Sequence, residues 1–362
     1  MKLALVHDYL VQDGGSEQVL RVLSSLYPDT PIFTLFHDKN KFNDLHNVRT
    51  SFLQSIPGAM KRYEWFLPLM PAAIEHLPLK PFDMVVSSSS TFAKGVLVPP
   101  HAFHICYCHT PTRFLWLDAH EYLDEMRHSW PVRKLLPIYL SRLRQWDRLA
   151  ADRVDLFVAN SEAVRERIRR YYRKDAIVVH PPVDTDRFSI SHAPKTYYLA
   201  GGRFVGYKRI DIAIDAANRL KLPLKVFGDG PLRDRLKDIA GDTVEFVGRV
   251  ENNEQARLFA DCIAYIAPQE EDFGITAVES MASGRPVISF SHGGAKETVK
   301  SGITGVLFNE QNWESLADAI INFDESRFDP AVIRAHTEQF SRVRFENEML
   351  RIIEHTYSKR FS

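Results

Sequence analysis

Two glutamates in the stretch EEDFGITAVE (residues 270–279), Glu271 and Glu279, stand eight positions apart. The residues after Gly274 have helical character, and two arrangements are open. A helix that began at Glu271 would carry both carboxylates near one face, because about 3.6 residues make a turn. A helix that begins near Gly274 would leave Glu271 in the loop over its N-terminus and Glu279 inside it. The spacing is also common on amphipathic helices, so its meaning depends on the neighbouring motifs.

A basic loop lies upstream of this stretch. The segment GGRFVGYKRID (201–211) carries Arg203 and Lys208 between an expected strand and an expected helix. A guanidinium is a fork of donors and an ammonium is a point charge, and together they suit a diphosphate. The alternative is an ordinary solvated basic loop.

Two glycine-containing turns bear on nucleotide binding. In HDYLVQDGGSEQVL (7–20) a strand runs into Gly14 and Gly15 before a helix, which lets backbone N–H groups approach an anion. An ordinary strand–loop–helix turn is the alternative. The second turn, GDGPLR (228–233), lacks the third small residue of a dinucleotide fingerprint. A nicotinamide dehydrogenase is therefore disfavoured.

A histidine follows an expected strand in ICYCHTPTRFLW (105–116). His109 could donate a hydrogen bond or act as an acid or base, and a structural histidine is the alternative. Cys106 and Cys108 would share one face of the strand while His109 points to the other. No second Cys/His cluster follows, so a metal site is not expected.

Short apolar runs alternate with helical patterns, which predicts an α/β protein with two doubly wound domains, each built on a parallel sheet. Strands are expected at 3–7, 83–88, 104–108, 156–160, 176–180, 196–201, 224–228, 244–248, 264–268 and 286–290. Helices are expected at 208–220, 231–239, 252–261, 275–283 and 313–322. HPPVD (180–184) is typical of a linker, and segments 51–80 and 118–150 are expected to be irregular insertions. Ligands bind beyond the carboxyl ends of such strands, where the candidate residues fall.

Composition limits the class of protein. The 362 residues are enough for about two domains, and 45% hydrophobic with 25% charged residues is typical of a globular protein. Lys+Arg and Asp+Glu both number 46, so a nucleic-acid partner is not expected. Three cysteines make no disulfide framework and favour a reducing compartment. With neither a signal-peptide pattern nor a run of 18 apolar residues, we expect a cytoplasmic protein.

The order and spacing of the motifs resemble the retaining glycosyltransferases of family 4, which have the GT-B architecture. The resemblance covers nearly the whole chain and is most specific in 196–310. It rests on Glu271-x7-Glu279 followed by AVESMASGRPVI, the Arg203…Lys208 pair, GDGP (228–231), VEFVGRV (244–250), VANSEAVRERI (158–168) and PPVD (181–184). SSSSTFAKGV (87–96) and CHTPTRFLW (108–116) are similar to a bacterial branch that includes polysaccharide mannosyltransferases.

The resemblance implies two Rossmann-like domains facing an interdomain cleft. Residues 1–180 would form the acceptor-side domain, with a C-terminal helix at about 344–362 packing back on it, and residues 185–340 would bind the donor. The implied reaction moves a hexose onto a glycan or a polyprenyl-linked glycan, as in polysaccharide or lipopolysaccharide biosynthesis. The expected hexose is mannose, with GDP-mannose as its donor. It would need neither a metal nor a cofactor besides the nucleotide-sugar substrate.

The resemblance also implies site residues. The expected catalytic group is His109, Glu271, Arg203 and Lys208, with Glu271 on the donor sugar, Arg203 and Lys208 on the diphosphate, and His109 facing the sugar from the other domain. Glu279 would bind the ribose. Further donor contacts are expected at Gly14, Gly15, Gly248, Arg249, Val250, Phe273, Gly274, Ile275 and Thr276, and acceptor contacts at Lys94 and Arg113.

Two segments, 51–70 and 126–153, mix basic and aromatic residues. That mixture suits an anionic lipid surface, so a peripheral position at the inner face of the cell membrane is one expectation, and a solvated helix packed on the first domain is the alternative. Two other functions stay open. One is an epimerase or a phosphorylase-like enzyme of GT-B fold, and the other is a catalytically inactive subunit that binds a sugar nucleotide.

Overall fold

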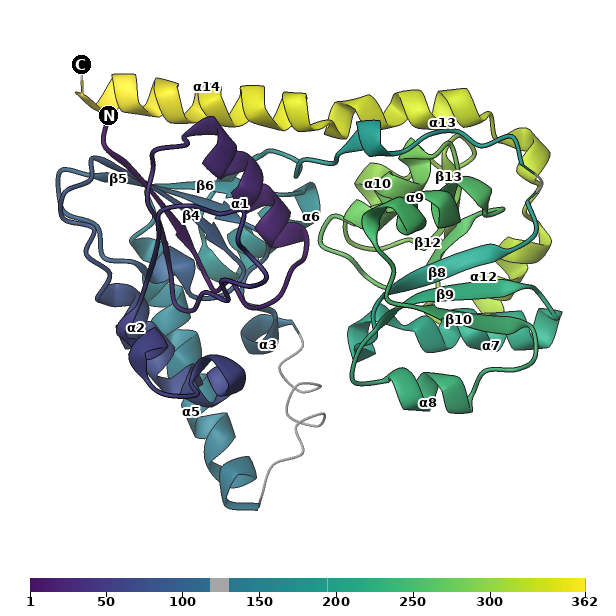
Figure 1. Ribbon diagram of the computed structural model, residues 1–362, viewed down its shortest axis with the longest axis horizontal. Helices are drawn as coiled ribbons and strands as arrows, with labels where there is room; N and C mark the ends of the chain where they lie inside the picture. The colour runs from purple at the N-terminus through teal and green to yellow at the C-terminus, as the bar shows by residue number, and fades with distance from the viewer. Residues whose placement is uncertain (118–129, 194, 362) are drawn as a thin grey trace. The chain divides into compact units, whose positions relative to one another are not determined.

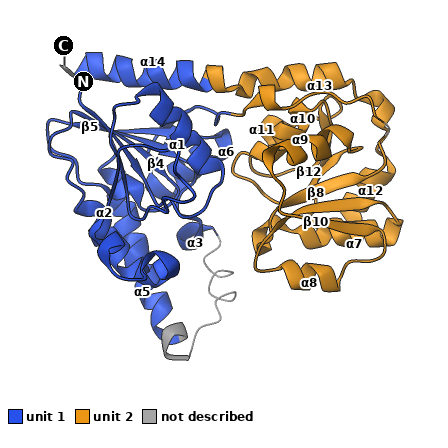
Figure 2. Ribbon diagram, viewed as in Figure 1, with its two compact units in different colours: residues 1–182, 345–362 blue, residues 183–344 orange. Residues whose placement is uncertain are grey.

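The computed structural model describes residues 1–117, 130–193 and 195–361. These residues divide into two compact units, which Figure 2 shows in different colours. Unit 1 comprises residues 1–182 and 345–362, and unit 2 comprises residues 183–344. The expected boundaries at 180 and 185, and the expected start of the last helix at about 344, lie next to these divisions.

Unit 1 is built on a seven-stranded parallel sheet of order β3-β2-β1-β4-β5-β6-β7. Its strands are β1 (Leu3–His7), β2 (Ile32–Thr34), β3 (Val48–Thr50), β4 (Met84–Ser89), β5 (Phe103–Cys108), β6 (Leu156–Ala159) and β7 (Ala176–Val178). Its helices are α1 (Gly15–Leu26), α2 (Met70–Glu75), α3 (Arg113–Trp116), α5 (Trp130–Asp152) and α6 (Glu162–Arg167), together with most of α14 (Arg342–Phe361). Figure 1 labels β4, β5, β6 and the helices among these elements.

Both faces of this sheet are covered. Ala4 and Val6 of β1 belong to a core that includes residues of α2 and α5, whereas the alternating Leu3 and Leu5 belong to a core with α1 and α14. Successive side chains of a strand point to opposite faces, so a strand buried on both faces reads as one apolar run. This is why β1 could be predicted from its apolar run in the sequence.

Unit 2 repeats the plan with a six-stranded parallel sheet of order β10-β9-β8-β11-β12-β13. Its strands are β8 (Tyr198–Arg203), β9 (Leu224–Asp229), β10 (Val244–Gly248), β11 (Tyr265–Ala267), β12 (Val287–Phe290) and β13 (Gly305–Phe308). Its helices are α7 (Ile210–Leu220), α8 (Arg233–Asp238), α9 (Asn252–Asp261), α10 (Ile275–Ala282), α11 (Ala295–Thr298), α12 (Trp313–Ile321) and α13 (Pro330–His336). The predicted α/β class with two doubly wound domains is confirmed.

The two segments expected to be irregular are more ordered than predicted. Segment 51–80 contains 3-10 turns, among them η2 (Met60–Leu69), and the short helix α2. Segment 118–150 contains the 23-residue helix α5 from Trp130 onward. The prolines and aromatics that suggested irregularity are tolerated because the turns and the helix pack their apolar side chains into the core of unit 1. Residues 118–129 lie outside the described part of the chain.

No helix among the described residues is long and apolar enough to cross a membrane. The three cysteines are free and buried.

Candidate functional site

The pair of glutamates in unit 2 takes the second of the two expected arrangements. Helix α10 begins at Ile275 with Gly274 as its N-cap, so Glu271 lies in the preceding loop and Glu279 lies inside the helix. Gly274 has φ +93°, a conformation that glycine adopts without the cost other residues bear. The same loop is held by the Gly294 backbone N–H, which donates to the Glu271 carbonyl at 2.8 Å.

Lys208 and Glu271 meet beyond neighbouring strands. Lys208 ends the short 3-10 turn η6 (Gly206–Lys208) after β8, and Glu271 follows β11, which pairs with β8. The Lys208 ammonium forms an ion pair with the Glu271 carboxylate, and Gln269 donates to the same carboxylate at 3.0 Å. Burial alone would lower the pKa of Lys208, but the Glu271 charge raises it overall. Lys208 is therefore a permanent cation.

Glu279 has a different environment. Its carboxylate accepts a hydrogen bond from Arg187 at 3.0 Å and one from Gln255 at 3.3 Å, and the side chain is only 8% exposed. Burial raises the pKa of Glu279 to about 7, because it outweighs the lowering effect of the Arg187 guanidinium. The two glutamates of the motif thus differ in environment: Glu271 pairs with a lysine in the loop, whereas Glu279 is buried inside the helix with a raised pKa. Arg187 and Gln255 were not predicted, because they lie 92 and 24 positions from Glu279 and belong to no motif.

The other expected donor residues of unit 2 divide into two groups. Phe273, Gly274 and Thr276 line a small cleft together with Glu271, and Ile275 is the first residue of α10. Arg203 ends β8 as an exposed residue on the same sheet edge. The second group lies at the far strand of the sheet: Gly248 ends the edge strand β10, Arg249 is exposed, and Val250 packs against the core.

In unit 1, His109 comes directly after β5 and is buried. Its Nε2 is 2.8 Å from the Ser88 hydroxyl, and its ring packs edge-on against Tyr107. Burial lowers the pKa of His109 to about 3, so the ring is neutral at physiological pH. Of the roles open to His109, hydrogen bonding suits this state and general acid catalysis by an imidazolium does not.

Gly14 and Gly15 stand where β1 leads into α1. Gly14 is the extended N-cap residue and Gly15 is the first residue of the helix. A Cβ on Gly14 would lie 3.3 Å from a Glu17 carboxylate oxygen, so a larger residue there would press on that acid. The turn therefore lies close to the buried Glu17 side chain.

Lys94 requires a correction. Its side chain is 1% exposed, and its ammonium lies 2.6 Å from the Asp147 carboxylate. Asp147 also accepts hydrogen bonds from Thr112, Trp116 and Tyr172 at 2.7–2.8 Å. Lys94 is thus committed to a buried ion pair and does not face an acceptor. Arg113, the other expected acceptor contact, is partly exposed at the start of α3.

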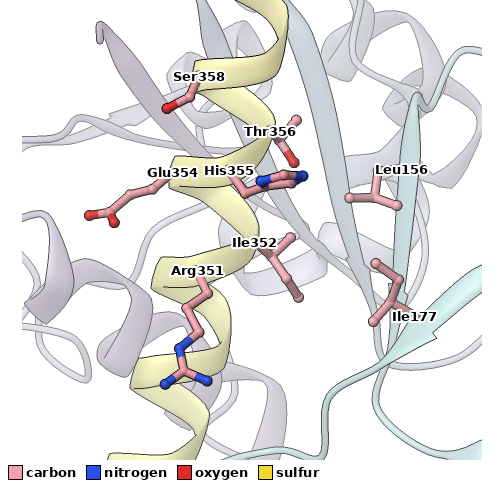
Figure 3. A pocket seen from close by; sticks show the side chains of 8 residues that line it. All are labelled: Leu156, Ile177, Arg351, Ile352, Glu354, His355, Thr356 and Ser358. Carbon is pink, nitrogen blue, oxygen red and sulfur yellow. The ribbon is translucent and has the colours of Figure 1, made fainter.

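A hollow of about 580 Å³ in unit 1 is a different feature (Figure 3). It lies in unit 1 between α14 and the strands β6 and β7, with Ile352, Leu156 and Ile177 as its apolar lining. Leu156 is the first residue of β6, so the hollow lies toward the amino end of that strand. Ligands of open α/β sheets bind at the opposite end, and the hollow contains none of the candidate residues.

Among the residues the structure describes, no group of three or more His, Cys, Asp or Glu side chains is placed to hold a metal ion.

Fold and site geometry together define a class: two parallel-sheet Rossmann-like domains with charged residues beyond their strands, the plan of GT-B glycosyltransferases. Two family models match adjoining parts of the chain, Glycosyltransferase Family 4 over residues 17–187 and Glycosyl transferases group 1 over residues 182–339. The chain belongs to this family of glycosyltransferases.

Three curated relatives illustrate the range of the family. An uncharacterized glycosyltransferase of Methanocaldococcus jannaschii is 29% identical over 51% of this chain and 54% of its own length. The O-antigen chain mannosyltransferase C of Escherichia coli is 27% identical over 46% and 50%, and the D-inositol 3-phosphate glycosyltransferase of Mycobacterium leprae is 28% identical over 54% and 53%. The matches thus span about half the length of these relatives.

Solved structures match over nearly the full chain. Anabaena HepE in complex with UDP superposes with a TM-score of 0.74 at 17% identity, covering 98% of this chain and 100% of that one. Sucrose-phosphate synthase of Thermosynechococcus elongatus has a TM-score of 0.74 at 17% identity and covers 99% of both chains. At this identity the likeness establishes the fold alone.

Proposed function

We propose that this chain is a retaining glycosyltransferase that moves a hexose from a nucleotide sugar to a glycan. The observation that carries the proposal is the ion pair of Lys208 and Glu271 at neighbouring strand ends, directly before α10. A cation and the backbone N–H groups of a helix start can stabilise the negative charge that grows on a departing diphosphate. The adjacent Glu271 carboxylate can accept hydrogen bonds from the sugar hydroxyls.

In this proposal the remaining groups orient the donor. Arg203 adds a second cation for the diphosphate, and Glu279 binds the ribose hydroxyls with Arg187 and Gln255 supporting it. His109 hydrogen-bonds the sugar in its neutral form. Two cations and a helix start can balance a diphosphate, so no metal is required.

The proposed donor is GDP-mannose, and the proposed acceptor is a lipid-linked glycan of bacterial polysaccharide synthesis. The similarity to an O-antigen mannosyltransferase supports mannose. A thermal-shift series with GDP-mannose, UDP-glucose, GDP and UDP tests the donor, because a ligand that binds the native state raises the melting temperature. We expect the largest shift with GDP-mannose; a larger shift with a uridine nucleotide would overturn the choice of donor.

Transfer itself needs a second assay. With radiolabelled donor and a polysaccharide or polyprenyl-linked acceptor, we expect the sugar to move with its anomeric configuration retained. An inactive binding subunit would show the thermal shift but release no sugar, even by slow donor hydrolysis. An epimerase would return a changed nucleotide sugar without an acceptor.

We further propose that unit 1 contacts an anionic membrane at the cytoplasmic face. Helix α5 exposes Leu135 and Ile138, at 65% and 57%, and the adjoining turn η2 exposes Trp65 at 73%. Tyr139 of α5 donates to the Leu67 carbonyl of η2 at 2.9 Å, which holds these elements together. Exposed apolar side chains with lysines and arginines beside them suit a lipid interface.

A further inference from the structure

A chain of buried hydrogen bonds runs behind His109. From His109 Nε2 it passes to the Ser88 hydroxyl at 2.8 Å, then to His7 Nδ1 at 3.2 Å, and from His7 Nε2 to the Glu17 carboxylate at 3.3 Å. All four side chains are at least nine-tenths buried. The proposed function uses only His109, so the other three need an explanation.

The sheet brings these residues together. His7 ends β1, Ser88 lies near the end of β4, and His109 follows β5; these three strands are neighbours in the sheet. His7 and Ser88 are paired in register. Glu17 lies in the first turn of α1, where Ser16 also donates to its carboxylate at 3.0 Å.

The direction of the hydrogen bonds follows from counting protons. Burial acts to raise the pKa of Glu17, but hydrogen bonding to His7 lowers it overall, so the carboxylate is ionised and can only accept. The proton on the His7–Glu17 hydrogen bond must therefore sit on His7 Nε2. A neutral His7 then has a bare Nδ1, which needs the hydroxyl proton of Ser88. Because Ser88 has only that proton, its oxygen must accept one from His109 Nε2.

A doubly protonated His7 would reverse this order, because Ser88 could then donate to His109. The geometry favours the neutral form. The hydrogen bond from His7 to the Glu17 carboxylate measures 3.3 Å, whereas bonds from an imidazolium to a carboxylate are typically about 2.7–2.9 Å.

We propose that Glu17 is a positioning residue that acts through His7 and Ser88 to hold His109 in its Nε2-protonated tautomer, leaving Nδ1 as a hydrogen-bond acceptor. This inference rests on the proposed function for its consequence, since Nδ1 would accept a hydrogen bond from a hydroxyl of the donor sugar. A lone pair at that point favours a neutral hexose over a sugar that presents a carboxylate there.

The tautomer can be measured without any donor. In the 362-residue chain with ¹⁵N-labelled histidine, long-range ¹H–¹⁵N spectra distinguish a protonated from a bare ring nitrogen, and His109→Gln identifies the signals of His109. We expect Nε2 protonated and Nδ1 bare in the wild type. A His109 protonated at Nδ1, or a doubly protonated His7, would overturn the proposal, even if no variant could be folded.

Glu17→Gln then tests the origin of the effect. Its amide can donate to His7 Nε2 as well as accept, so we expect a mixture of His109 tautomers. Asp13→Asn removes an exposed acid from the same turn and should leave the tautomer unchanged. An unchanged tautomer in Glu17→Gln would show that the carboxylate does not set it.

A second measurement separates positioning from general damage. With a donor that the wild type uses, Glu17→Gln should lower turnover about tenfold, the effect of weakening one hydrogen bond by roughly 1.4 kcal/mol. Its affinity for the bare nucleoside diphosphate should stay unchanged; a loss of that affinity would mean a structural role and contradict the proposal. If the wild type transfers no sugar, the proposed function fails, whereas the tautomer proposal is still decided by the ¹⁵N spectra alone.

Discussion

The ion pair of Lys208 and Glu271 gives the two residues separable roles. Lys208→Ala should raise the activation barrier by about 2.7–4 kcal/mol and so lower turnover roughly 100- to 1000-fold, because the departing diphosphate loses one preorganised cation.

Glu271→Ala should damage sugar transfer while leaving the affinity for free nucleotide near that of the wild type. Glu279→Ala should weaken both nucleotide and nucleotide sugar. Isothermal titration with steady-state kinetics checks the three variants, and indistinguishable behaviour of the two glutamate variants would refute the assignment.

The pKa of Glu279 gives a pH prediction with a definite sign. Because burial raises this pKa from 4.5 to about 7, the folded state holds a proton that the unfolded chain has released between these values. The stability due to Glu279 is therefore fully present below pH 4.5 and is lost as the pH rises through 7. At about 1.4 kcal/mol per pKa unit, the loss is up to about 3 kcal/mol.

Glu279→Gln removes the titration and serves as the reference. Urea unfolding at several pH values should show the free energy of unfolding of the wild type falling relative to Glu279→Gln between pH 4.5 and 7. A constant difference across this range would mean that Arg187 keeps Glu279 ionised throughout.

The site residues that could be read from the sequence are those that belong to a motif with local spacing. Glu271, Gly274 and Glu279 stand within one loop and helix, and Lys208 follows a strand in a recognisable turn. Arg187 and the supports of His109 could not be found, because their contacts join residues 10 to 92 positions apart. Lys94 was misassigned for the same reason: its charge is visible in the sequence, but its partner Asp147 is not.

At the scale of elements, the buried strands with continuous apolar runs were predicted nearly to the residue, as for β1 and β12. The missed strands are β2, β3 and β13. Two of them have three residues, too few to display a period, and β3 is partly exposed, so it lacks an apolar signal. These strands form through long-range pairing in the sheet, and no local sequence pattern predicts them.

Asp147 joins four elements of unit 1 and should therefore contribute strongly to the stability of the fold. Its carboxylate in α5 receives Lys94 of the turn η3 (Ala93–Gly95), Thr112 and Trp116 of the α3 region, and Tyr172 of the turn η4 (Ile168–Tyr172). Asp147→Ala should lower the free energy of unfolding by about 3–5 kcal/mol, because it leaves a buried ammonium without its counter-charge.

A double-mutant cycle isolates this ion pair. Lys94→Met in the Asp147→Ala background should cost less than Lys94→Met alone, with a coupling of about 0.5–3 kcal/mol in chemical denaturation. Exposed Asp152 of the same helix, changed to Ala, is the control and should alter stability by less than about 1 kcal/mol. Additive effects of Lys94→Met and Asp147→Ala would contradict a stabilising ion pair between the two side chains.

At the scale of the whole molecule, the structure changes which residues can form a membrane face. Arg144 of α5 donates to the Leu115 carbonyl, and Arg153, the residue after α5, donates to Glu75 and to the Gly95 carbonyl. These two basic residues therefore form contacts within unit 1. Arg148 pairs with Asp152. The part of the predicted segment before Trp130 lies outside the described residues. The exposed candidates that remain include Leu135, Ile138 and Arg142 of α5 and Trp65 of η2.

We expect the protein to sediment with liposomes of phosphatidylserine and phosphatidylcholine, and less with phosphatidylcholine alone. Leu135→Ser with Ile138→Ser should weaken binding to both, since burying each side chain is worth about 1.5–3 kcal/mol at most. Arg142→Gln should weaken binding only to the anionic liposomes, by about 1 kcal/mol, and added salt should remove that difference. Ile321→Ser of α12, which is 65% exposed in unit 2, is the matched control and should bind as the wild type. If the Leu135/Ile138 variant also binds as the wild type, or if the wild type ignores anionic liposomes at low salt, then α5 is a solvated helix and the acceptor need not be a lipid.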